Sequence, residues 1–156
     1  MTKKIIYLLL ALLVFIQFFR PTKNISNAEQ PQAINKVYTV PTEVEGILKN
    51  ACFDCHSNTT NYPWYINIQP VAWWMNDHIE EGKRKLNFSE FGSYTLKKQD
   101  HKLDELTDEI KENMPLKSYT FVHKEAKLST LQRKQLADWA NGLRKEIQSK
   151  LISLPK

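Results

Sequence analysis

Five consecutive residues constrain this chain more than any other part of its sequence. Cys52, Phe53, Asp54, Cys55 and His56 form a C-x-x-C-H pattern, which is the attachment motif of c-type haem. Two thiols at this spacing can add to the two vinyl groups on one edge of a porphyrin, and the histidine that follows is then held beneath the ring. The chain has 2 cysteines, and both lie in the motif. The motif therefore predicts one covalently attached haem c, with His56 as an axial ligand of the iron.

Other uses of a cysteine pair fit the sequence less well. A redox-active CxxC pair needs no following histidine and usually sits beside a βαβ pattern. A structural zinc site needs four ligands, typically two such pairs, and there is no second pair. The net charge of +5 comes without zinc-finger spacing or a basic stripe with interleaved aromatics, so a nucleic-acid partner is not expected.

The N-terminus carries a targeting pattern. Lys3 and Lys4 precede an apolar run from Ile5 to Phe19, broken once by a glutamine. As a helix this run is roughly 22 Å long, short of the ~30 Å hydrocarbon core. We interpret residues 1–20 as a membrane anchor or signal segment, and we favour an uncleaved anchor in the inner membrane over cleavage near Ala28. Both alternatives place the haem domain in the periplasm.

The rest of the chain divides into a linker and one domain. Residues 21–40 are polar and lack periodicity, which predicts a flexible tether. Residues 41–150 are expected to form an all-α, cytochrome c-like domain. Its first helix begins at a capping box formed by Thr42 and Glu45 and leads directly into Cys52.

Apolar periodicity predicts three further helices. One opens at Pro70 and carries a mostly apolar stripe of Val71, Trp74, Met75, His78, Ile79 and Gly82. After residues 83–99, which we expect to form a loop or a loop with a short helical turn, the next starts near Asp100 and turns Leu103, Leu106 and Ile110 inward. The last is capped by Ser129 and Gln132, with an inner stripe of Leu136, Trp139, Ala140, Leu143 and Ile147. We expect this last helix to cross the one that precedes Cys52.

Two residues are candidates for the sixth iron ligand. Met114 precedes a proline, which holds its backbone extended and lets the thioether approach the iron without an obstructing helix. His78 is the alternative, because a histidine on an apolar stripe can face the distal side. Further candidates for contact with the haem are Trp64, Tyr65 and Trp74, and either of the first two could donate a hydrogen bond to a propionate. Simple packing is the alternative role for these aromatics.

Together these residues resemble the cytochrome c-like haem-binding domain family, which consists of bacterial monohaem c-type proteins. The resemblance rests on Val40-Pro41, Cys52 to Asn58, Tyr62 to Tyr65, Gln69 to Trp74, His78-Ile79, Gly82, Asn87 to Ser89, Met114-Pro115, Tyr119 and His123 to Trp139. It implies a haem bound covalently at Cys52 and Cys55 and ligated by His56. The Met-Pro, Tyr, His, Leu-Ser and Trp pattern of c-type cytochromes further implies Met114 as the distal ligand.

These features predict a membrane-tethered monohaem cytochrome that exchanges single electrons with redox partner proteins. We expect an electron carrier rather than an enzyme. Two alternatives stay open. One is a haem peroxidase, or an accessory haem domain of one, in which His78 or His123 would act as acid or base. The other is a haem-based sensor or binding module.

Overall fold

The computed structural model describes residues 2–153, and within that range all its regular elements are helices. The only bridge between extended segments in these residues joins Ile25 to Thr59. The all-α prediction is confirmed. The elements are α1 (Thr2–Ile16), α2 (Ile34–Val37), α3 (Thr42–Ala51), α4 (Phe53–His56), η1 (Trp64–Asn67), α5 (Val71–Lys85), η2 (Phe88–Ser93), α6 (Leu96–Glu112), α7 (Lys117–Val122), η3 (Lys124–Ala126) and α8 (Thr130–Ser153), where η marks a 3-10 helix.

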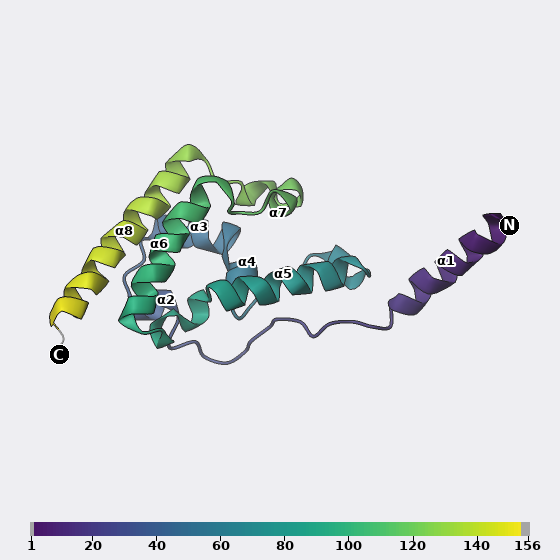
Figure 1. Cartoon of the computed structure of the whole chain (residues 1–156), viewed down its shortest axis with the longest axis horizontal. Coiled ribbons are helices and arrows are strands. Elements are labelled where there is room, and N and C mark those ends of the chain that lie inside the picture. Colours follow the sequence, from purple (N-terminus) through teal and green to yellow (C-terminus); the bar gives the residue numbers. More distant parts are fainter. Residues whose placement is uncertain (1, 154–156) are drawn as a thin grey trace.

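The hydrophobic core lies where α6 and α8 run side by side and α3 packs against α8 (Figure 1). Leu48, Leu103 and Leu136 from these three helices are fully buried. The predicted inner stripes of α6 and α8 are therefore confirmed, as is the crossing of α8 over α3, the helix that precedes Cys52. Trp139 differs from the other stripe residues, because it is only partly buried and its indole N–H donates to the carbonyl of Thr39 at 3.3 Å.

One of the two predicted capping boxes forms. Gln132 Oε1 accepts from the backbone N–H of Ser129 at 2.9 Å, and Ser129 Oγ accepts from that of Gln132 at 3.2 Å. The box predicted at Thr42 and Glu45 is wrong. Pro41 occupies the N-cap position, so Thr42 already lies in the first turn of α3 and makes no capping hydrogen bond. Glu45 instead accepts from the Asn35 amide at 3.1 Å.

Residues 83–99, predicted as a loop or a loop with a short helical turn, are mostly helical and contain such a turn in η2. α5 continues to Lys85, and α6 begins at Leu96 after Thr95 accepts from the backbone N–H of Lys98. Between them η2 buries Phe88 and Phe91, which are 2% and 0% exposed. Burial of these two phenyl rings stabilises η2, although the sequence of this segment has no helical periodicity.

Two parts of the segment 21–40, around Asn24 and Ile34, are packed against the domain, unlike the flexible tether predicted for the whole segment. Ile34 in α2 is 1% exposed, and α2 contacts η2. The buried Asn24 amide donates to the Ser57 carbonyl at 2.9 Å and to Thr60 Oγ1 at 3.0 Å. These partners lie more than thirty positions further along the chain, so local composition gave no sign of them.

Helix α1 stands apart from the domain and has no buried residue (Figure 1). It forms within the predicted anchor segment and is 15 residues long. Among the described residues, no helix combines the length and the apolar character that crossing a membrane requires. A spanning anchor helix, as predicted for residues 1–20, is thus not found.

Candidate functional site

The C-x-x-C-H motif lies at a break between two helices that packs closely against α5. Cys52 has φ −128° and ψ −43°, which ends α3, and α4 then carries Phe53 to His56. A Cβ atom on Gly82 of α5 would lie 2.5 Å from the carbonyl oxygen of Cys55. Only glycine permits this approach, so Gly82 sets how deeply Cys55 and His56 sit against α5.

His56 is held as a neutral imidazole of defined tautomer. Its Nδ1 donates to the Leu86 carbonyl at 2.9 Å, since a carbonyl oxygen can only accept. Burial lowers the pKa of His56, and the Leu86 and Gly82 carbonyls oppose this only in part. The ring nitrogen Nε2 therefore keeps its lone pair, which is the state in which histidine binds a metal.

A cavity of about 550 Å³ lies beside the motif. Cys55, His56, His78 and Met114 all line it, so four of the predicted site residues come together in one place. Leu86, Leu106 and Leu116 supply apolar wall, whereas Glu81, Lys85, Glu105, Asp108 and Glu109 add charged groups to the lining.

Met114 reaches this cavity from the segment that follows α6. Its backbone N–H donates to the Glu109 carbonyl at 2.9 Å. Its carbonyl accepts from the Arg133 guanidinium at 3.0 Å, and the same Nη1 also contacts the Ile110 carbonyl. Arg133 on α8 thus fixes the backbone of Met114. The sequence analysis missed this residue because nothing local links positions 114 and 133.

A second cavity of about 240 Å³ adjoins the first. The two share four lining residues, namely Cys55, His78, Leu116 and Tyr119. Tyr65, Trp74 and Met75 line only the smaller one. His78 donates from Nδ1 to the Trp74 carbonyl at 2.8 Å, and the two rings lie 4.3 Å apart.

A chain of polar contacts connects the motif to the wall of the smaller cavity. Tyr119 donates to Asp54 Oδ2 at 2.7 Å, and its ring stacks on His123 with centroids 4.4 Å apart. His123 Nε2 in turn is hydrogen-bonded to the hydroxyl of Tyr65 at 2.7 Å. Burial, together with Asp54, raises the pKa of Tyr119. The sequence singled out Tyr65 and His123 separately, and the structure pairs them.

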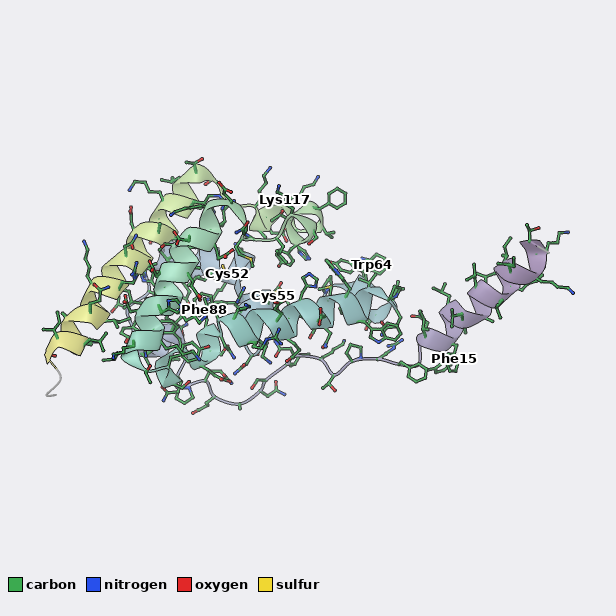
Figure 2. The ribbon with its side chains drawn as sticks, viewed as in Figure 1. Phe15, Cys52, Cys55, Trp64, Phe88 and Lys117 are labelled. Carbon is green, nitrogen blue, oxygen red and sulfur yellow. The ribbon has the colours of Figure 1, made fainter. Side chains whose placement is uncertain are left out.

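Two predicted site residues lie outside the cavities. Trp64 is 76% exposed and lines neither cavity. Cys52 packs against the hydrophobic core, near Cys55 at the junction of the helices (Figure 2), and is absent from both linings. Burial raises the pKa of Cys52 to about 12 and that of Cys55 to about 11, so both remain protonated thiols at neutral pH.

The site offers no alternative metal centre of the zinc type. Within residues 2–153, no group of three or more histidine, cysteine, aspartate or glutamate side chains is arranged to hold a metal ion. Histidine and thioether side chains around one cavity are instead ligands that haem iron accepts, because the porphyrin supplies the other four donors.

Comparison with known proteins agrees with this donor set. The model of a haem-binding domain family matches residues 11–142, which include α4, α5 and the Met114 segment. The chain belongs to the haem-binding domain family. No curated protein and no solved structure matches it. As a member of this family, the chain is a haem-binding protein.

The side chains that line the larger cavity and the volume of that cavity both suit haem. Ligand sites commonly enclose about 300–1,000 Å³, and the larger cavity falls in that range at about 550 Å³. Cys55 and His56 lie on one wall and Met114 on the lining contributed by the α6–α7 connection. The packing of Cys52 toward the core departs from a preformed covalent site.

Proposed function

We propose that this haem-binding protein is a membrane-attached, monohaem c-type cytochrome that exchanges single electrons with redox partner proteins in the periplasm. The observation that supports it best is that Cys55, His56 and Met114 line one cavity. A haem held there would have a thiol for attachment and two axial donors from this chain.

Covalent attachment would use Cys52 and Cys55. Each thiol would add across one vinyl double bond, with the sulfur bonding to one carbon and the hydrogen to the other, so nothing is lost. Haem that survives denaturing electrophoresis in the wild-type protein tests this step. Haem that migrates away as freely as in a Cys52→Ala, Cys55→Ala double variant would reject it.

The two axial donors would be His56 and Met114. When bound, haem supplies an iron that gains and loses one electron at a time. The Leu86 carbonyl orients the His56 ring, burial keeps that ring neutral by lowering its pKa, and Arg133 keeps the Met114 backbone in place. Leu106 and Leu116 contribute apolar side chains to the lining of the same cavity. A thioether opposite histidine raises the reduction potential relative to two histidines.

Optical spectra identify the sixth ligand. The ferric wild-type protein should show a near-infrared thioether-to-iron charge-transfer band that disappears in Met114→Ala and persists in His78→Ala. A band that is absent from the wild type, with a spectrum that changes only in His78→Ala, would assign the ligand to His78 instead.

A haem enzyme, or an accessory domain of one, is the second candidate function. The smaller cavity favours it, because His78 and His123 both line a space next to the larger one. An enzyme needs an open iron position beside such groups. Carbon monoxide or cyanide that binds without displacing a protein ligand would favour the enzyme, whereas slow binding that removes the thioether band favours the electron carrier.

Attachment to the inner membrane would depend on α1. Its large apolar side chains from Ile5 to Phe15 are all exposed, from Leu13 at 48% to Leu8 at 70%. Lys3 and Lys4 precede them, as expected of a segment whose N-terminal end stays in the cytoplasm. Resistance to extraction at high pH in the wild type, lost in a Leu9→Arg, Leu13→Arg variant, is the expected result. Extraction of the wild type would reject the attachment.

A further inference from the structure

A group of large exposed apolar side chains covers the end of the domain nearest α1. Trp64 of η1, Trp73 and Trp74 of α5, and Phe121 and Val122 of α7 form this group, which we call the aromatic face. Trp64 is 76% and Phe121 84% exposed. We propose that the aromatic face rests on the surface of a lipid bilayer.

The three elements of the aromatic face adjoin one another. Val122 of α7 and Trp74 of α5 line the same smaller cavity. Figure 2 shows Trp64 at the end of α5 that points toward Phe15 and α1. Exposed apolar groups are common singly, but contiguous patches of large aromatics mark surfaces that contact a partner or a membrane.

The C-terminal end of α1 is fastened directly beside this face. Gln17 Nε2 donates to the Gln69 carbonyl at 3.2 Å, and Gln17 Oε1 accepts from the Gln69 N–H at 2.9 Å. The Phe19 carbonyl accepts from the Trp73 indole at 2.7 Å and from the side chain of Gln69 at 2.9 Å. Gln69 is 1% exposed, so its three hydrogen bonds to Gln17 and Phe19 are partly buried, whereas the one from the Trp73 indole is exposed.

This fastening links the environment of α1 to that of the aromatic face. Gln17 directly follows the last residue of α1, and Phe19 lies three positions after that residue. The apolar medium that takes up α1 must therefore lie next to Trp73, which is hydrogen-bonded to Phe19. The inference therefore rests on the proposed attachment of α1 to a membrane.

The chemistry of the aromatic face suits a lipid surface. Tryptophan carries an apolar body with one N–H and is enriched where the hydrocarbon region meets the headgroups. Arg20 and Lys23 follow α1 at the same end of the chain, and basic residues near a bilayer surface are attracted to anionic lipids. Trp139, the fourth tryptophan, lies away from this face in α8.

Hydrogen exchange of the haem-loaded full-length protein on vesicles of phosphatidylcholine and phosphatidylglycerol tests the inference. Adding vesicles should slow the exchange of amides in 64–67 and 117–122 at least threefold. The effect should be lost in a Trp64→Gln, Phe121→Gln variant. A Leu131→Gln, Ile152→Gln variant is the matched control, because these residues of α8 are 65% and 87% exposed but lie outside the aromatic face. It should behave as the wild type does.

Three outcomes separate this inference from the attachment of α1. Wild-type protein that floats with the vesicles while 64–67 and 117–122 exchange at their original rate overturns the lipid contact and leaves the attachment standing. Slowed exchange that persists in the Trp64→Gln, Phe121→Gln variant also overturns the lipid contact. Slowed exchange that persists in a Leu9→Arg, Leu13→Arg variant supports the contact and shows that it forms without α1.

Discussion

The two halves of the domain are built differently. Where α3, α6 and α8 meet, side chains such as Leu48, Leu103 and Leu136 are completely buried against one another. On the side of α5, η1 and α7, the helices enclose two cavities, and α7 has no buried residue at all. One half has a packed hydrophobic core, whereas the other half lines two cavities.

This difference explains where function can reside. An empty cavity with apolar walls lowers the stability of a small domain, because the side chains that line it lose dispersion contacts. The walls of Cys55, Leu116 and Tyr119 are shared by both cavities. We infer that haem takes the place of core side chains on this side of the molecule, while the α3–α6–α8 side positions the walls.

The comparison is tested most strongly by removing side-chain volume from each half. Leu136→Ala should lower the free energy of unfolding by about 3 kcal/mol, because it opens a cavity in a region that is fully packed. Val122→Ala in α7, where the side chain is 55% exposed, should change it by about 0.5 kcal/mol or less. Chemical denaturation of the two haem-loaded variants measures both. Equal losses would mean that the two halves are not distinct.

A smaller effect is expected at the contact that joins the motif to α5. Gly82→Ala places a Cβ atom 2.5 Å from the Cys55 carbonyl and should cost about 1–3 kcal/mol through overpacking. Gly142→Ala in α8 is the matched control, because nothing lies within 4 Å of the added atom, and alanine favours a helix by about 1 kcal/mol. Thermal unfolding and the haem spectrum would be compared. An unperturbed Gly82→Ala protein would contradict the close-packing argument.

Arg133 links the packed half to the cavity, so its removal should change both the free energy of unfolding and the spectrum of the bound haem. Arg133→Met loses the hydrogen bonds to the carbonyls of Met114 and Ile110 and should cost about 1–2 kcal/mol. If Met114 ligates the iron, its near-infrared band should also weaken. Lys134→Met, which loses only a surface ion pair with Asp138, should leave that band unchanged. A full-strength band in Arg133→Met would show that Arg133 does not position Met114.

The smallest effect concerns Tyr119 and depends on pH. Tyr119→Phe removes the hydrogen bond to Asp54 and should cost about 1 kcal/mol at neutral pH. Burial raises the pKa of Tyr119 above its ordinary value of 10.0, so the stabilisation is complete below pH 10 and is lost as the pH rises further.

Denaturation at about pH 9 and about pH 11 measures this dependence. The gap in stability between wild type and Tyr119→Phe should narrow at the higher pH, because only the wild type must keep a buried phenol protonated. A gap that stays constant or widens would contradict the assigned environment of Tyr119.

Features that depend on neighbouring residues were readable from the sequence. The reciprocal cap of Ser129 and Gln132 forms as predicted, because capping acts within one turn of helix. The apolar stripes of α6 and α8 also face inward, since Leu103 and Leu136 repeat at the helical period and are buried. The motif at Cys55 and His56 likewise defines its chemistry over five adjacent positions.

Features that depend on contacts between distant residues could not be predicted from the sequence. Thr42 did not cap α3 because Pro41 took that position. Asn24 is buried through hydrogen bonds to Ser57 and Thr60, so a segment with the composition of a tether became part of the domain.

The sequence by itself determined the haem motif, the helical class and the two candidate ligands opposite His56. The tertiary structure alone decided that Met114 and His78 line one cavity with His56, that Arg133 holds the Met114 backbone, and that Cys52 packs toward the core. The reason is physical. A periodic pattern specifies which side of a helix is apolar, but only the packing of several helices specifies which apolar side meets another side chain and which encloses a cavity.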